Sequence, residues 1–129
     1  MVLLYHNIYI IVMIGGKEMS CLFCSIVSGE IPSTKVYEDE WVYAFKDIDP
    51  QAPVHIVLIP KEHCANFMEL KDMKILSYLG EAVQKICVQE GIDKNGFRVV
   101  TNCGEQGGQT VDHLHFHILG GRNLMWPPG

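Results

Sequence analysis

The sequence has few positively charged residues and no basic cluster. Ten lysines and arginines stand against 15 aspartates and glutamates, which gives a formal net charge of -5. An acidic chain with scattered basic residues lacks the patch that would neutralise the phosphates of DNA or RNA. We therefore expect no binding to polymeric nucleic acid, and a small ligand instead.

The most apolar segment, residues 1–14, is too short to span a bilayer. It also lacks the positive region and the cleavage site of a signal peptide, so neither membrane insertion nor export is expected. Two interpretations stay open: an added strand that covers a sheet edge, or an extension upstream of a true start at Met19. The second is preferred, and it divides the chain into an extension, 1–18, and a domain, 19–129.

The five cysteines are an odd number and follow no secretory signal. Such thiols are typical of a reducing compartment, where they stay free or hold a metal, so we expect a cytoplasmic protein. The 129 residues are 48% hydrophobic and 19% charged, and no repeat or linker divides them. This composition supplies enough apolar material for one core.

Short apolar runs separated by turn signals predict a mostly β chain with one long helix. Apolar residues recur from Ile75 to Ile86 at the spacing of one helix face, and this pattern stops at Gly91. Strands are expected at residues 35–38, 41–45, 54–59, 97–101 and 113–119, with Asp39 and Glu40 at a hairpin turn. Because short connections favour antiparallel neighbours, we predict an α+β fold in which an antiparallel five-stranded sheet packs on one long helix.

Three histidines, His113, His115 and His117, occupy alternate positions near the C-terminus. In an extended strand they share one face, while the apolar residues between them share the other. We expect the apolar face to point inward and the imidazoles to line a surface. Imidazole is neutral or charged with similar ease near pH 7, so this row suits metal ligation, proton transfer or nucleophilic attack. The spacing alone does not choose among the three.

The histidine run resembles the signature of the histidine triad (HIT) family. Residues 109–119 contain, at 113–119, the pattern His-φ-His-φ-His-φ-φ, in which φ is apolar, and every apolar position is filled. Further matches to the histidine triad nucleotide-binding branch lie at residues 44–55, 59–63 and 120–129. The resemblance extends from about Cys21 to Gly129, and it implies the fold of that family.

The resemblance also implies a purine nucleoside phosphoramidase, which hydrolyses a nucleotide joined through nitrogen to an amine by way of a nucleotidyl-histidine. His115 corresponds to the nucleophile, and neutral imidazole is a competent nucleophile at phosphorus. His117 would contact the phosphoryl oxygens, and His113 would orient the site or bind a metal. Thr110, where relatives commonly have serine, would donate to the leaving group or to a phosphoryl oxygen. By itself, Thr110 is also typical of the start of a strand.

The family's ligand is a purine nucleotide of the AMP or GMP type. Asp47 corresponds to the acceptor of the ribose hydroxyls, and Ile48 would lie beside base and sugar, although Asp47 alone reads as a turn residue. His55 and Asn102 would approach the phosphate. Gln109 follows a glycine-rich loop whose backbone N–H groups suit phosphate, but such a loop is as often a simple turn.

Cys21 and Cys24 form a C-x2-C pair that, with His63 and His113, resembles the structural zinc site of some family members. Two thiolate and two imidazole ligands suit tetrahedral zinc with no position open to water. The alternative is that the two cysteines are free thiols packed beside the first helix. We expect Zn²⁺ and no organic cofactor.

The chain ends in Trp126-Pro127-Pro128-Gly129, a stiff and uncharged segment. In the related branch two protomers join their sheets as a homodimer, and this segment reaches the partner's active site; a flexible tail is the alternative. Two further functions stay open: a nucleotide-binding interaction module with incidental activity, and a hydrolase of dinucleoside polyphosphates. The C-terminal segment argues against the second.

Overall fold

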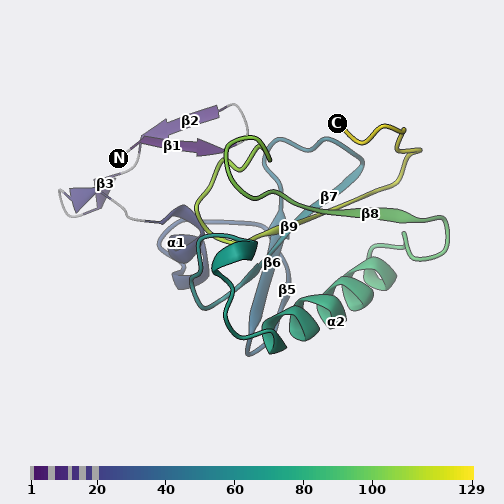
Figure 1. The fold of residues 1–129 in the computed structure, drawn as a ribbon, viewed down its shortest axis with the longest axis horizontal. Helices are drawn as coiled ribbons and strands as arrows, with labels where there is room; N and C mark the ends of the chain where they lie inside the picture. The colour runs from purple at the N-terminus through teal and green to yellow at the C-terminus, as the bar shows by residue number, and fades with distance from the viewer. Residues whose placement is uncertain (1, 6–7, 12, 15–16, 19–20) are drawn as a thin grey trace.

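The computed structural model describes residues 2–5, 8–11, 13–14, 17–18 and 21–129. Its main sheet has five antiparallel strands in the order β5-β6-β7-β9-β8 (Figure 1). The strands are β5 (Lys35–Glu38), β6 (Val42–Lys46), β7 (Val54–Pro60), β8 (Phe97–Thr101) and β9 (Phe116–Gly120). The predicted α+β fold with a five-stranded antiparallel sheet is therefore confirmed.

The long helix α2 (Lys74–Gln89) packs on one face of this sheet. Every second residue of β6 and β7 points toward it, as the period-two geometry of strands requires. The layer between them includes the buried residues Val42, Ala44, Ile56, Leu58, Ile75, Leu79, Ile86, Leu114 and Ile118. Each buried Leu or Ile contributes roughly 1.5–3 kcal/mol, so this layer is a main source of folding stability.

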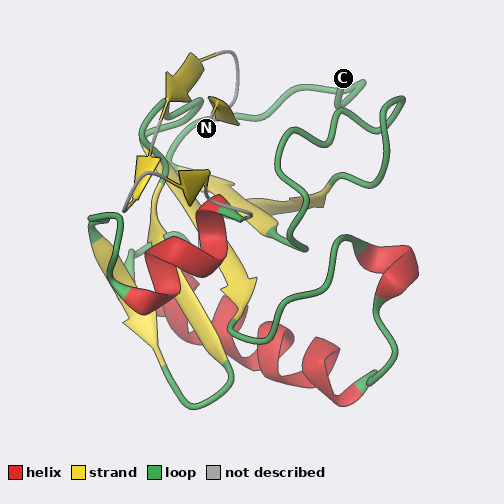
Figure 2. Cartoon of the chain, turned by 90° about the vertical axis from the view of Figure 1, so that its left-hand side faces the viewer, coloured by secondary structure: helices red, strands yellow, loops and turns green. Residues whose placement is uncertain are grey.

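A short helix, α1 (Leu22–Ser28), packs against the residues of the sheet that point away from α2. Its residues Leu22, Phe23 and Ile26 cluster with the intervening residues of β6 and β7. The Cys21 side chain caps the helix by accepting from the Cys24 N–H at 3.3 Å, and the helix ends at Gly29, whose φ is +85°. The two helices lie apart, with strands of the sheet between them (Figure 2).

The histidine segment is only partly a strand. β9 begins at Phe116, which pairs with Thr101 of β8 and Leu58 of β7, so residues 113–115 precede the ladder. His113 is fully buried and His115 is 4% exposed. The prediction of a strand over 113–119 was therefore wrong for its first three residues. The expectation that the imidazoles line a surface was also wrong for these two, because Phe23 of the N-terminal helix packs against both rings.

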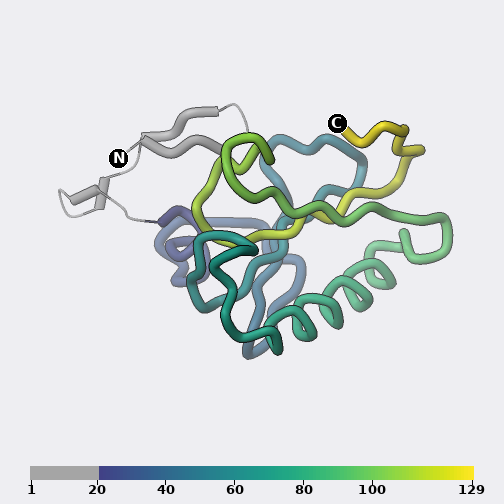
Figure 3. Tube along the Cα trace, viewed as in Figure 1, coloured from purple at the N-terminus to yellow at the C-terminus, as the bar shows by residue number. Residues whose placement is uncertain are grey.

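The segments around residues 61–66 and 109–115, far apart in the sequence, lie side by side (Figure 3). The Leu114 N–H donates to the Cys64 carbonyl at 2.7 Å, and the Gln109 side-chain amide donates to the Ala65 carbonyl at 2.7 Å. These contacts bring the residues after β7 next to the histidine segment.

The N-terminal segment forms two separate two-stranded sheets: β1 (Val2–Tyr5) with β2 (Ile8–Ile11), and β3 (Met13–Ile14) with β4 (Lys17–Glu18). None of these four described strands joins the five-stranded sheet. The proposed start at Met19 falls outside the described residues and stays a prediction. Within the described residues, every helix is too short or too polar to cross a membrane.

Candidate active site and metal centre

His115 is held in place by contacts with His113, Thr101 and Phe23. Its Nδ1 lies 2.7 Å from the backbone oxygen of His113, and the Thr101 hydroxyl donates to its carbonyl at 2.9 Å. A carbonyl oxygen only accepts, so Nδ1 of His115 carries the proton and Nε2 of the neutral ring keeps its lone pair. The ring of Phe23 meets the imidazole edge-to-face at 5.1 Å between centroids. This arrangement orients a ring whose Nε2 carries the lone pair that is able to attack an electrophile.

His117 lies on β9, two residues after His115, and its ring centroid lies 5.0 Å from that of His115. Its Nδ1 is 2.9 Å from Nε2 of His55 on β7. The backbone N–H of Gln51 donates to Nδ1 of His55 at 3.0 Å, so the proton of neutral His55 lies on Nε2, within reach of both His117 Nδ1 and the Asp47 carboxylate. A neutral His117 that accepts at Nδ1 carries its own proton on Nε2. In that tautomer His117 donates from Nε2.

Asp47 approaches the same nitrogen of His55 that contacts His117. Its Oδ2 is 3.2 Å from Nε2 of His55 and 3.9 Å from Nδ1 of His117, while its Oδ1 accepts from the Asp49 N–H at 2.8 Å. The carboxylate is fully buried. Three predicted site residues, Asp47, His55 and His117, thus come together, and this contact between side chains of different strands was not foreseen from the sequence.

Asp47 and Ile48 also line a cavity of about 550 Å³. The other walls of this cavity come mainly from α1 and the chain before β5: Leu22, Ile26, Ile31, Pro32, Ser33, Thr34, Phe45 and Lys46. The mostly apolar lining suits a flat, weakly polar ring, and the backbone and side-chain polar groups at its edge suit hydroxyls. Sequence reasoning missed Leu22, Ile26 and Phe45, because they carry no signal beyond that of core residues.

The predicted residues Asn102 and Gln109 hold the loop between them. The Asn102 amide donates to the Gly107 carbonyl at 2.6 Å, and the Gln109 side chain accepts from the Gly104 N–H at 3.0 Å. A Cβ at Gly107 would lie 2.4 Å from the Cys103 carbonyl oxygen, so the loop requires glycine there. Thr110 is exposed beside this loop, six residues before β9, and so is not the start of that strand.

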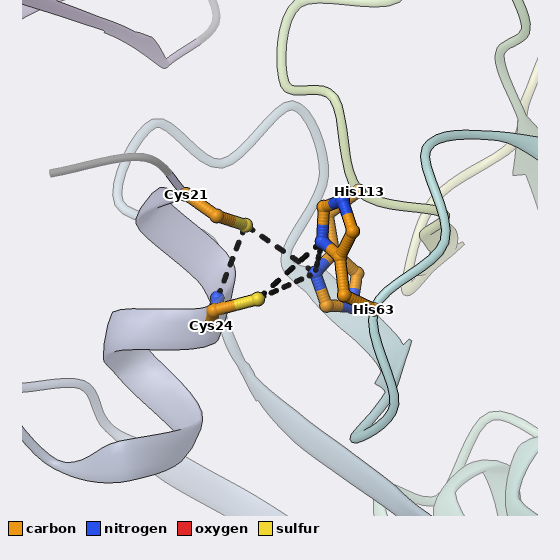
Figure 4. A group of neighbouring side chains, drawn as sticks. All are labelled: Cys21, Cys24, His63 and His113. Carbon is orange, nitrogen blue, oxygen red and sulfur yellow. Dashed lines mark hydrogen bonds between the residues drawn. The ribbon is translucent and has the colours of Figure 1, made fainter.

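Cys21, Cys24, His63 and His113 converge at the N-terminus of α1 (Figure 4). Nδ1 of His113 lies 3.4 Å from Sγ of Cys21 and 3.5 Å from Sγ of Cys24. Nδ1 of His63 lies 3.4 Å from Sγ of Cys24 and 3.1 Å from Nδ1 of His113. Zinc bonds of about 2.3 Å to sulfur and about 2.0–2.1 Å to nitrogen would place tetrahedral ligands roughly 3.3–3.8 Å apart. The four side chains therefore fit a zinc ion closely.

The protonation of these ligands also suits a cation. Nε2 of His113 lies 2.8 Å from the Pro60 carbonyl, so Nε2 carries the proton and the lone pair of Nδ1 faces the cluster. Burial lowers the pKa of His113 to about 4, with His63 and His115 adding to the effect, so the ring is neutral at pH 7. Burial and the neighbouring Cys21 raise the pKa of the Cys24 thiol to about 12. Without a cation this thiol keeps its proton, and a bound metal would displace it.

This chain is similar to known proteins in sequence and in structure. A family model described as HIT domain matches residues 28–124. A Brassica juncea protein named 14 kDa zinc-binding protein is 49% identical over 112 residues, which cover 84% of this chain and 98% of that protein. An Arabidopsis thaliana protein named adenylylsulfatase HINT1 is 47% identical over 117 residues, which cover 88% of this chain and 79% of that protein.

A solved structure, a HIT family hydrolase from Legionella pneumophila, is 46% identical and superposes with a TM-score of 0.83, covering 85% of this chain and all (100%) of that one. The family match extends over well more than half of the sequence and includes the segment with the three histidines. This chain therefore belongs to the HIT domain family.

Proposed function

We propose that this protein is a HIT-family hydrolase that cleaves purine nucleoside 5′-phosphoramidates, and related nucleotidyl adducts, to the nucleoside monophosphate through a nucleotidyl-histidine at His115. One observation carries the proposal: the 2.7 Å contact of Nδ1 with the His113 carbonyl leaves Nε2 of His115 with the lone pair. The hydrolases among its relatives support the reaction class.

In the first step, Nε2 of His115 bonds to phosphorus while the bond from phosphorus to the leaving amine breaks. Nε2–H of His117 donates to a phosphoryl oxygen, where negative charge increases in the transition state. The departing amine takes its proton through the Thr110 hydroxyl from water, which reaches this exposed side chain. His117 therefore stabilises charge in this scheme and gives up no proton.

In the second step, water attacks phosphorus, the bond to Nε2 breaks, and its electron pair returns to His115. The proton of the attacking water passes to solvent, and nucleoside monophosphate is released. Two displacements replace one difficult displacement, which is the advantage of a covalent intermediate. Adenylylsulfate is another adduct that fits this scheme, as the name of the Arabidopsis relative suggests. Its sulfate leaves as an anion and needs no proton.

The cavity beside α1 would take the purine and the ribose. Its apolar walls at Leu22, Ile26 and Phe45 support stacking of a purine, with Asp47 and Ile48 at the ribose. His55, Asn102 and Gln109 remain the residues proposed to approach the phosphate. Their present hydrogen bonds hold the surrounding loops in place.

The cluster of Cys21, Cys24, His63 and His113 would hold a structural zinc ion. All four ligands come from the protein, so the metal supplies a crosslink between α1 and two distant segments. The relatives named zinc-binding protein support this assignment. The proposed zinc takes no part in the displacement at phosphorus.

A homodimer with a continuous sheet is supported by β8, which is an edge strand of the five-stranded sheet. Phe97 and Val99 are exposed on one of its faces, where a partner would cover them. The Arg98 guanidinium donates to the carbonyls of Leu124 and Met125, which ties the C-terminal segment to the same strand. Trp126, 80% exposed, would then reach the partner's site. A cytoplasmic location, and no binding to membranes or nucleic acid, stay predictions.

The decisive experiment compares the wild type with His115→Ala on adenosine 5′-phosphoramidate. We expect turnover by the wild type and a loss on the order of 10³-fold or more in the variant, because a nucleophile is removed. Quenching the wild-type reaction during turnover should trap the nucleotidyl group on His115. Equal turnover by both proteins would reject the assignment. Binding of AMP without turnover by either would favour the interaction module.

A further inference from the structure

We propose that His113 is a positioning residue that couples the metal cluster to the nucleophile: metal binding at Cys21, Cys24, His63 and His113 fixes the orientation and the tautomer of His115. This inference rests on the proposed role of His115. It assigns the cluster a function in the reaction cycle beyond stabilising the fold.

Both ring nitrogens and the backbone oxygen of His113 contact neighbouring groups. Its Nε2 meets the Pro60 carbonyl at 2.8 Å, its Nδ1 faces the cluster, and its backbone oxygen meets Nδ1 of His115 at 2.7 Å. The side chain is fully buried, and the ring of Phe23 lies 6.0 Å from it between centroids. A shift of the His113 backbone that carried this ring away from the cluster would therefore also displace the carbonyl that holds His115.

The segment from His113 to His115 is not fixed by the sheet, because β9 begins at Phe116. Its backbone is held instead by tertiary contacts. The Leu114 N–H bonds the carbonyl of Cys64, the residue after the ligand His63, at 2.7 Å. A metal that draws His63 and His113 together would hold both sides of this contact at once.

Helix α1 extends the same coupling to the ligand cavity. Its first turn carries Cys21 as N-cap and Cys24 as the second thiol. Between them in the sequence, Phe23 packs edge-on against His115, while Leu22 lines the cavity. A metal bound to the two thiols would immobilise α1, and with it one wall of the cavity and one contact of the nucleophile.

Coupling of this kind is reciprocal. If metal raises the affinity for nucleotide by some factor, nucleotide raises the affinity for metal by the same factor, and such couplings typically amount to about 5–150-fold. Metal should also select one tautomer of His115, protonated at Nδ1. A crosslink that only stabilises the fold would change neither the nucleotide affinity of the folded protein nor the His115 tautomer.

The test uses the full chain, stripped of metal by chelation and then loaded with Zn²⁺. The Zn²⁺ affinity is measured by competition with a chelator, with and without saturating AMP, and the AMP affinity is measured with and without Zn²⁺. We expect both to rise by the same factor, about 5-fold or more. Histidine ¹⁵N NMR should show His115 as a single Nδ1–H tautomer with Zn²⁺ and a mixture without it.

The double variant Cys21→Ser/Cys24→Ser should lose both responses, whereas Cys64→Ser, at the neighbouring thiol outside the cluster, should keep them. Should metal removal unfold the protein, exchange of Zn²⁺ for the larger Cd²⁺ replaces it, and the His115 signals should then shift. A His115 spectrum that does not respond to the metal, with equal affinities, overturns the proposal. Because the NMR readout needs no turnover, a protein that fails to hydrolyse phosphoramidate would refute the proposed function and leave this test valid.

Discussion

Nε2 of His55 lies 2.9 Å from Nδ1 of His117 and joins two neighbouring strands through their side chains. The register that aligns Val57 with His117 places the two rings on the same face. When Nε2–H of His55 donates in this contact, the proton of neutral His117 lies on Nε2, the nitrogen that the proposed reaction uses.

Replacing His55 with alanine should therefore lower kcat/KM by about 10–100-fold, because the His117 tautomer is no longer fixed. His55→Gln should retain more activity, since its amide nitrogen is able to donate from nearly the position of Nε2. Steady-state kinetics on adenosine 5′-phosphoramidate, with circular dichroism to check folding, measures this effect. Equal losses in the two variants would contradict the tautomer argument.

Asp39 should make the hairpin of β5 and β6 sensitive to acid. Burial acts to raise its pKa, but hydrogen bonds from the Trp41 N–H, the Tyr37 hydroxyl and the Val42 N–H together lower it below the usual value. A lowered pKa means that the folded state favours the carboxylate, so this stabilisation is present above the unfolded pKa and is lost as the pH falls through the folded one. Asp39→Ala should cost about 1–2 kcal/mol at pH 7 and less at pH 2. Urea unfolding of both proteins at the two pH values measures this, and a pH-independent difference would refute it.

Zinc should copurify with the protein at about one ion per chain without added metal. Cys24→Ser should reduce that content and lower the melting temperature, because the metal binds the folded state. Bound zinc displaces the proton from a thiol whose pKa is raised to about 12, so zinc affinity should fall as the pH falls. Elemental analysis and a chelator titration at two pH values test both statements. Sub-stoichiometric zinc in the wild type would reject the site.

Gly107→Ala should disturb the loop before the histidine segment, since its Cβ would lie 2.4 Å from the Cys103 carbonyl oxygen. We expect a loss of about 1–3 kcal/mol or a displaced loop, together with lower kcat/KM. The matched control is Gly80→Ala in α2, where a Cβ meets nothing within 4 Å. That change should stabilise the protein by about 0.5–1 kcal/mol, because alanine is the better helix former. Thermal unfolding with kinetics distinguishes the two variants, and similar behaviour would exclude a specific role for Gly107.

Phe97→Arg should convert the proposed dimer to monomer, because a charge on the exposed face of an edge strand opposes pairing with a partner. Val88→Arg is the matched control, since Val88 is also exposed but lies on α2. Sedimentation velocity at several concentrations reports the state of each variant. A wild type that stays monomeric, or a dimer that tolerates both changes, would refute this interface.

Local sequence patterns predicted much of the sheet. Residues 35–38 and 97–101 form strands as expected, and β6 and β7 each differ by a single residue at one or both ends. The histidine strand was overextended because alternation continues through His113, whereas a strand also needs hydrogen-bonded neighbours, and those pairings begin only at Phe116. The alternation of apolar residues is a property of one segment, whereas the extent of β9 depends on its hydrogen bonds to β7 and β8.

The proximity of the metal-cluster residues could be predicted from the sequence, whereas contacts that depend on packing were missed. The HIT-family resemblance named the four metal-cluster residues, and the structure brings them together. The contact of Asp47 with His55, and the cavity wall at Leu22 and Ile26, depend on strand register and on where α1 packs. A seven-residue helix is too short for a clear periodic signal, so its place over the sheet could not be inferred.

The two covered faces of the sheet have different roles: one holds the larger hydrophobic core, and the other holds the candidate site. On the α2 face, mainly aliphatic side chains fill a broad layer. Opposite it, imidazoles, thiols and a buried carboxylate share a smaller layer with the cavity. Ligand preference can therefore diverge among relatives through exchanges at Leu22 or Ile26, while the framework that keeps the strands together is left untouched.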